Sequence, residues 1–284
     1  MTCSFLKTNI QVLSAASCCL LSAACSDNER TEKGAPLQEN GQLSVVEQSQ
    51  TPPKNYTEGL SVHDLFLDEL ACELAEAVAS GDTNAIDAAI EKGADVNYVG
   101  KDDITPLAWA LMNQNKVGFE HLLNREADPN VRFGTRGSLL SLSIDVDDLF
   151  FLETALKYGG DPNQRIKFGG TDTISLLWKA ITTVVPKPDK VRVLINAGAD
   201  ITEQRHGGGV VKSCAMKNHY ENVYIFLEAG ASYSTNREPS SLIHCIETRA
   251  VHPDDSDHEW LEKVVAFLKE KGIEVNEGML NIQP

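Results

Sequence analysis

The five residues Gly93-Ala94-Asp95-Val96-Asn97 decide the fold, because degenerate copies of this phrase return along the rest of the chain. Successive copies begin 33, 33, 39, 32 and 42 residues apart. Such a period is typical of a protein built from stacked repeats, so the sequence predicts a single elongated domain. The later copies, from the best to the most degenerate, are Glu126-Ala127-Asp128-Pro129-Asn130, Gly159-Gly160-Asp161-Pro162-Asn163, Gly198-Ala199-Asp200-Ile201-Thr202, Gly230-Ala231-Ser232-Tyr233-Ser234 and Gly272-Ile273-Glu274-Val275-Asn276.

Acidic residues outnumber basic ones in this chain of 284 residues, and the formal net charge is −16. Lys7 is the only charged residue among the first 24, so the rest of the chain is slightly more acidic still. Nucleic-acid binding depends on neutralising phosphates with lysine and arginine. We therefore expect no nucleic acid among the partners.

The seven cysteines are unevenly distributed, with four in the first 25 residues. Cys72, Cys214 and Cys245 are scattered through the remainder and do not form a disulfide framework. We expect these three to be small buried core residues and not metal or redox groups.

Residues 1–24 predict a secretory signal peptide, because they combine one early cation with a run of apolar and small residues and contain no acid. Leu21-Ser22-Ala23-Ala24-Cys25 resembles the lipobox of bacterial lipoproteins, with Leu one position earlier than usual. The resemblance implies that Cys25 is lipidated, and Ser26 after it implies the outer membrane. The expected location is the periplasmic side of that membrane, with the lipid as the only membrane contact. If the lipobox is not used, the protein would be soluble in the periplasm or secreted.

Residues 25–59 are polar and poor in aromatic residues. Too little apolar surface is available there to offset the entropy lost on ordering, so we expect a disordered tether. As a flexible coil it would span on the order of 30 Å.

Residues 60–284 predict a folded helical domain. Apolar residues recur at helical spacings from His63 onward, Asp64 is placed to cap the first turn, and Gly81 ends the helix. A second helix is expected over residues 83–92, with Gly93 supplying a left-handed exit. The product is an antiparallel helix pair followed by an extended loop.

The next unit opens with Thr105-Pro106-Leu107-Ala108-Trp109-Ala110, which resembles the opening of an ankyrin repeat. Thr105 is placed to cap the helix and Pro106 suits its first turn. The resemblance implies an all-α, ankyrin-repeat solenoid of about six stacked helix-turn-helix units with projecting hairpin-like loops. Two insertions, Pro186-Lys187-Pro188 and residues 250–259, are expected between the helices of their units. Equivalent unit openings begin at Ser138, Ser175, Gly209 and Ser241.

The first unit carries acids that we expect to coat the solvent face of an end cap, as the terminal unit of a repeat array requires. They are Glu69, Glu73, Glu76, Asp82, Asp87 and Glu91.

The loop tips are the expected partner-binding surface, because they concentrate arginine and aromatic residues within an acidic chain. The alternative is that these cations are solvated and merely offset nearby acids. The candidate residues are Tyr98, Lys101, Arg132, Phe133, Arg136, Arg165, Lys167, Phe168, Arg205, His206 and Arg237.

Catalytic signatures are missing from the sequence, so we expect a non-enzyme without cofactor or metal. Histidine and acidic residues gather at 252–259 but match no known metal-binding spacing, and a solvated loop is the simpler interpretation. Gly207-Gly208-Gly209 lacks the lysine of a phosphate loop and is expected to make a loop tip flexible. Cys214 follows Lys212 at a helix start, where a thiol could be activated, but it takes the position of a small packed alanine.

Together these features predict a lipid-anchored, monomeric periplasmic ankyrin protein that binds a partner protein through its loop tips and concave face. One alternative, by resemblance to ankyrin lipoproteins, is an immunity protein that neutralises a periplasm-acting toxin such as a secreted antibacterial lipase. A second is a stabiliser of a periplasmic enzyme, and a third is a metal-dependent protein that uses residues 250–259.

Overall fold

The computed structural model describes residues 56–133, 137–167, 172–183, 185–205, 208–234, 241–248 and 256–276. The expected signal peptide, Cys25 and most of the expected tether lie outside the described residues. Within these ranges, no helix combines the length and apolar character that a membrane span requires.

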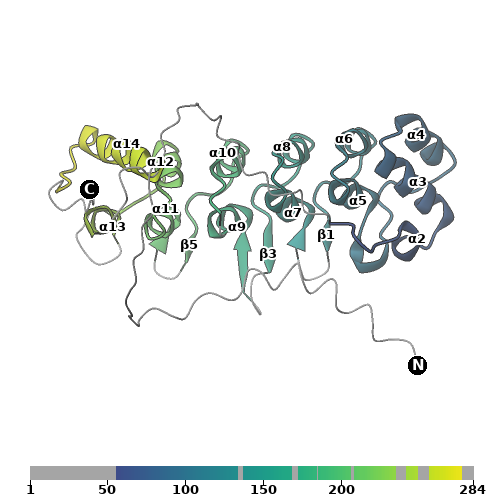
Figure 1. Cartoon of the computed structure of the whole chain (residues 1–284), viewed down its shortest axis with the longest axis horizontal. Coiled ribbons are helices and arrows are strands. Elements are labelled where there is room, and N and C mark those ends of the chain that lie inside the picture. Colours follow the sequence, from purple (N-terminus) through teal and green to yellow (C-terminus); the bar gives the residue numbers. More distant parts are fainter. Residues whose placement is uncertain are drawn as a thin grey trace, which may run out of the picture. The chain divides into compact units, whose positions relative to one another are not determined.

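The described part of the domain is mostly helical, as predicted. After the short α2 the helices follow one another in pairs, and the two members of each pair lie in two separate rows (Figure 1). We call α3, α5, α7, α9, α11 and α13 the inner helices and their partners the outer helices. The bounds are α2 Val62–Leu65, α3 Glu69–Ser80 with α4 Thr83–Glu91, α5 Pro106–Met112 with α6 Lys116–Asn124, α7 Leu139–Asp145 with α8 Phe150–Lys157, α9 Leu176–Thr182 with α10 Pro188–Asn196, α11 Val210–Ala215 with α12 Tyr220–Glu228, and α13 Leu242–Thr248 with α14 Ser256–Glu270.

Short antiparallel hairpins precede three of the inner helices. They are β1 Arg132–Phe133 with β2 Gly137–Ser138, β3 Arg165–Lys167 with β4 Thr173–Ser175, and β5 Gln204–Arg205 with β6 Gly208–Gly209. A 3-10 turn, η1 Lys101–Asp103, precedes α5. Gly208 and Gly209 are thus part of a strand, and Gly209 is also the N-cap of α11. This corrects the expectation that the glycine run only loosens a loop tip.

Hydroxyl and carboxylate side chains start the helices largely where the sequence predicts. The Thr105 hydroxyl accepts a hydrogen bond from Ala108 N at 3.3 Å, and Pro106 occupies the first turn of α5. Ser138 and Ser175 cap α7 and α9 in the same way. Because each cap satisfies a backbone N–H that the helix itself leaves unpaired, the unit openings fix where the inner helices begin.

The first helix differs from the expectation of one continuous helix capped by Asp64. α2 ends at Leu65, Phe66 is extended, and Asp68 caps α3 by accepting from Ala71 N at 2.9 Å. The break turns the Phe66 ring into the core, where it packs against Trp109 with 6.5 Å between ring centroids. Burial of this aromatic ring outweighs the local helical pattern.

The repeated phrase forms a chain of hydrogen bonds that we call the asparagine ladder (Asn97, Asn130 and Asn163). Each asparagine spans from its own phrase to the next one. Asn130 Nδ2 donates to Gly159 O at 3.0 Å, and its Oδ1 accepts from Asp161 N at 2.7 Å. Asn97 and Asn163 make the equivalent pair of bonds to the phrases that follow them. The ladder therefore joins four consecutive phrases through one side-chain type.

The first residue of each phrase has a left-handed backbone, which explains why glycine recurs there. Gly93, Gly159 and Gly198 have φ of 107°, 95° and 90°. Glu126 adopts φ 66° at the equivalent place without being glycine. A residue with a Cβ has a steric cost in this region, so Glu126 is retained by the surrounding bonds and not by its own preference.

Substituting one member of the ladder tests its contribution to stability. Asn130→Ala removes two inter-phrase hydrogen bonds, and we expect the free energy of unfolding to fall by about 1–3 kcal/mol. Thr202→Ala is the matched control, because the Thr202 hydroxyl bonds to Asp200 in its own phrase and not to the phrase that follows. Urea unfolding measures both, and equal losses in the two variants would contradict an inter-phrase role.

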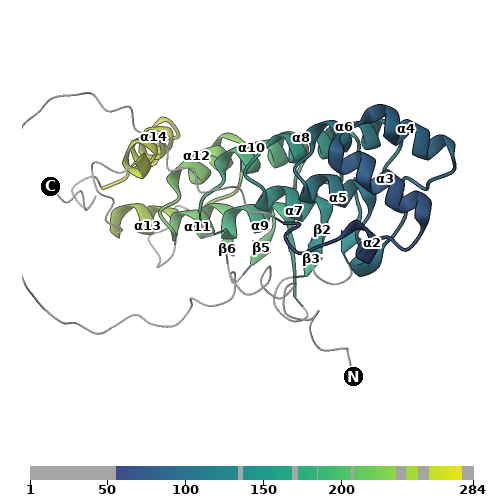
Figure 2. The ribbon, with the colours of Figure 1, turned by 45° about the vertical axis from the view of Figure 1, so that its right-hand side comes forward.

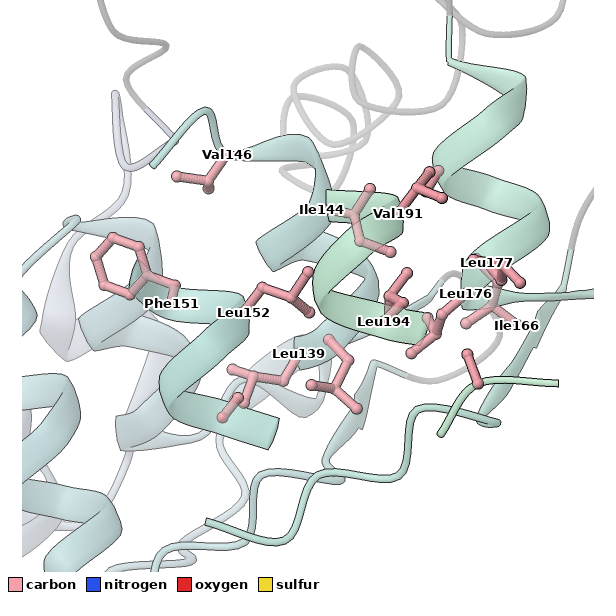
Figure 3. Packing of buried hydrophobic residues seen from close by; sticks show 14 of the residues in the cluster. Leu139, Ile144, Val146, Phe151, Leu152, Ile166, Leu176, Leu177, Val191 and Leu194 are labelled. Atoms are coloured by element: carbon pink, nitrogen blue, oxygen red, sulfur yellow. The ribbon is translucent and has the colours of Figure 1, made fainter. Parts of the chain in front are cut away.

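Buried aliphatic and aromatic side chains from consecutive pairs form one continuous core (Figure 3). In the third and fourth pairs Leu139, Leu152, Leu176 and Leu194 are fully buried and lie between the two rows of helices. Cys72, Cys214 and Cys245 are free and buried, as the sequence predicts.

One position of each outer helix lies eight residues before the first residue of the phrase that follows the helix, and it packs against the preceding pair. In α6 it is Gly118, where an added Cβ would lie only 2.5 Å from Val78 O of α3. In α10 it is Lys190, whose Nζ donates to Ser143 O at 3.0 Å and Asp148 O at 2.8 Å. Burial, followed by the charge of Lys187, lowers the pKa of Lys190 to about 8. The buried ammonium is accommodated because the carbonyls of the preceding pair accept its protons.

Asn222 occupies this position in α12 and is fully buried, with no hydrogen-bond partner for either its Oδ1 or its Nδ2 among the described residues. An unsatisfied buried amide costs about 1–3 kcal/mol. In α14 the equivalent residue is Val264, which is also fully buried.

We expect Asn222→Val to stabilise the protein by about 1–3 kcal/mol, because the substitution removes the unsatisfied groups. Asn163→Val, in which a fully used amide is lost, should destabilise it. Thermal and urea unfolding of the two variants check the signs. A destabilised Asn222→Val would show that this amide has partners in solution.

Candidate binding surface on the hairpins

The three hairpins lie on one side of the inner helices, in consecutive positions (Figure 2). Hairpin β1–β2 contacts η1 on one side and β3 on the other. In β3 the residues alternate, with Ile166 buried against Ile174 of β4 and with Arg165 and Lys167 exposed. The sheet pleat therefore fixes which residues form the outer surface.

Arginine side chains connect each hairpin to the next. Arg132 Nη1 donates to Arg165 O at 2.9 Å, and Arg205 Nη1 donates to Thr173 O at 2.6 Å. Within its own hairpin, Arg165 donates to Thr173 O at 2.8 Å. These bonds order the loops before any partner arrives, which lowers the entropy cost of binding.

Glu203 organises the charges between the second and third hairpins. Its Oε1 lies 3.1 Å from Arg165 Nη2 and 3.6 Å from Arg205 Nη1, and the side chains of Glu203 and Arg205 are each only 11% exposed. Arg205 also pairs with Asp172 and lies over the Trp178 ring at 5.8 Å. Two of the predicted partner-binding arginines are therefore already engaged by acids of this chain, as the alternative interpretation proposed.

Arg132 and Lys167 are the exposed cations that this network leaves for a ligand. Both side chains are exposed, and within the described part of the chain neither forms an ion pair with a carboxylate. A guanidinium keeps further donors after one bond to a carbonyl, and it pairs with carboxylates in bidentate geometry. The two residues lie in neighbouring hairpins joined by the Arg132–Arg165 bond.

The aromatic candidates are less available than the sequence suggests. Phe133 and Tyr98 are half-buried and pack against the core, and the Tyr98 ring lies 6.2 Å from that of Phe66. Lys101 is exposed on η1. The remaining candidates, Arg136, Phe168, His206 and Arg237, lie outside the described residues.

Sequence reasoning missed Glu203 and Asp172, which determine the charge of this surface. Glu203 lies five residues after Gly198, at the place that Gln164 takes after Gly159, so the repeat spacing could have located it. Its pairing could not be predicted, because Arg165 is 38 residues away along the chain.

The other candidate chemistry changes once the structure is considered. Cys214 is fully buried, and burial raises the pKa of its thiol to about 12, which excludes an activated thiol. α14 begins at Ser256, so His258 and Glu259 belong to a helix and not to an inserted loop. They pair along that helix with Glu262 and Lys263. Residues 250–255 lie outside the described residues.

Acids of the first pair also have roles beyond coating a face. Asp82 caps α4, and Asp87 accepts from His121 at 2.7 Å and pairs with Arg125 at 2.8 Å, His121 lying on α6 and Arg125 directly after it. The bond from His121 and the pairing with Arg125 lower the pKa of Asp87. Asp87 thus faces the next helix pair, contrary to the expectation of an outer face.

Groups of histidine, cysteine and carboxylate residues suited to a metal ion do not occur among the described residues. No protein-family model matches the chain, and no curated protein has significant sequence similarity to it.

Removing the central carboxylate should weaken the hairpin network. In Glu203→Leu the largely buried Arg205 loses a carboxylate, and we expect the free energy of unfolding to fall by about 1–3 kcal/mol. Asp172→Asn, at an acid whose side chain is 57% exposed, should cost less than about 1 kcal/mol. Urea unfolding compares the variants. Equal effects would mean that burial does not strengthen the Glu203 pairs.

Proposed function

We propose that this chain is an ankyrin-repeat protein that binds a partner protein through its hairpin surface, and that an N-terminal lipid on Cys25 anchors it in the periplasm. The repeated phrase, the unit openings and the paired helices support the fold assignment. The sequence of the first 25 residues supports the anchor. Repeat arrays of this kind place recognition in projecting loops while the stacked helices supply stability.

The observation that carries the proposal is the cross-linked row of hairpins with Arg132 and Lys167 exposed on it. A surface that only needed to be soluble would not require bonds from one hairpin to the next. Here Arg132 orders the following hairpin with one donor and keeps its remaining donors for a ligand. Rigid loops with exposed cations form a pre-organised recognition surface.

The chemistry of this surface indicates an acidic partner. Arg132 and Lys167 are uncompensated locally, whereas Arg165 and Arg205 are neutralised by Glu203 and Asp172. The protein as a whole has a charge of −16, so an acidic partner would be repelled elsewhere and oriented toward the hairpins. Charge complementarity of this kind acts on specificity and association rate.

Capture of the partner by surface variants tests the proposal. We expect Arg132→Ala with Lys167→Ala to reduce partner binding at least about tenfold, because both free cations are lost. The matched control is Arg192→Ala with Lys157→Ala, which removes two cations from the outer helices. Pull-down from periplasmic extract followed by titration of the captured protein provides the measurement, and far-ultraviolet circular dichroism verifies folding. Equal binding by the two double variants would refute the hairpin surface.

Gene deletion separates two roles for such a binder. Death or lysis of the deleted strain, relieved when a neighbouring secreted toxin is also deleted, would indicate an immunity protein. Loss of one periplasmic enzyme activity in healthy cells would indicate a stabiliser of that enzyme.

A further inference from the structure

Residues 56–60, which we call the strap, run from the start of α2 across the inner helices toward α7 (Figures 1 and 2). The strap contains one turn, closed by Leu60 N donating to Thr57 O at 3.0 Å. Its Tyr56 and Leu60 side chains are half-buried and pack against the core, while Glu58 and Gly59 between them are exposed. It thus contacts the domain through two apolar side chains and a short bridge.

Tyr56 reaches the C-terminal end of α7, two helix pairs beyond the pair that the strap precedes. Burial, and then the carboxylates of Asp145 and Asp147, raise the pKa of Tyr56 to about 12. Both acids have cationic partners, with Lys179 Nζ 2.7 Å from Asp145 and Lys187 Nζ 3.4 Å from Asp147. The phenol therefore lies beside an ion-paired rim and carries no charge of its own.

The inner-helix surface under this part of the chain is apolar where a solvent-facing surface would be polar. Trp109 of α5 is 4% exposed and is covered partly by Phe66, which follows α2. Leu142 of α7, one helical turn before Asp145, is half-buried. At the equivalent places in the next two pairs the residues are Lys179 and Ser213. The hydrophobic floor therefore lies over α5 and α7 and becomes polar beyond them.

We propose that the inner-helix surface over α5 and α7 is a groove for an extended peptide segment bearing an aromatic side chain, and that the strap fills this groove in cis as a releasable plug. Two anchoring side chains joined through Gly59, whose φ is 77°, form a contact small enough to exchange. An incoming segment with an aromatic ring would replace Tyr56 against the same floor. The proposal does not depend on the hairpin surface.

A thiol reporter in the groove tests whether the strap is releasable. In the full chain carrying Leu142→Cys, we expect Tyr56→Ala to increase the rate of labelling of that cysteine by a maleimide at least about tenfold, because its cover is lost. Tyr56→Phe retains the ring and should leave the rate unchanged. Mass spectrometry of the peptide containing position 142 separates this label from those on other cysteines.

A peptide supplied in trans tests the ligand class. The probe is the synthetic segment Pro53-Lys54-Asn55-Tyr56-Thr57-Glu58-Gly59-Leu60-Ser61, titrated against the full chain without the reporter substitution. We expect it to bind the Tyr56→Ala protein at least about tenfold more tightly than the wild type, and to lose this binding when its own tyrosine is replaced by alanine.

Three results would overturn the proposal. An unchanged labelling rate would show that the strap does not cover Leu142. Failure of the peptide to distinguish Tyr56→Ala from wild type would show that the surface is not a groove for such a segment. Loss of cooperative unfolding in both Tyr56→Ala and the milder Tyr56→Leu would make the strap an obligatory part of the core.

Discussion

The asparagine ladder is the interaction on which the arrangement of the helix pairs depends. Each asparagine bonds a carbonyl and an N–H of the next phrase, so the distance and orientation between successive exits from the outer helices are fixed at atomic precision. The aspartate two residues earlier holds the same turn by accepting from the asparagine N–H. With the exits fixed, the following hairpins must emerge side by side, and their arginines come within reach of one another.

The ladder also explains where the array changes character. At the fourth phrase Thr202 stands in place of asparagine, and its hydroxyl turns back to Asp200. A threonine has one hydroxyl on a shorter stem and no amide pair, so it does not reproduce both bonds. Beyond this point the outer helix α12 carries the unsatisfied Asn222. The pairs before Thr202 are thus joined by side-chain bonds at their phrases, and those after it depend more on core packing, which continues through Phe226 and Leu268.

Charge is used inside the molecule before it is available to a partner. A lysine of α10 bonds to carbonyls at the end of α7, arginines of the hairpins order their neighbours, and the outer helices pair across adjacent units. Most surface ion pairs of this type contribute little stability individually. Their effect here is to leave a small number of uncompensated cations at defined positions. A count of arginines along the loops therefore overestimates the recognition surface, and the neighbouring acids decide which cations remain.

The sequence by itself determined the period, the start of each inner helix and the glycine exits, because these depend on caps, backbone preference and spacings within a few residues. Thr105, Ser138, Ser175 and Gly93 all perform the predicted local roles. The break at Phe66, the Glu203 pairs and the path of Tyr56 toward Asp145 were decided only by the tertiary structure. Each joins residues tens of positions apart, and no local pattern specifies such a contact, since its energy comes from burial and charge that exist only after the pairs have stacked.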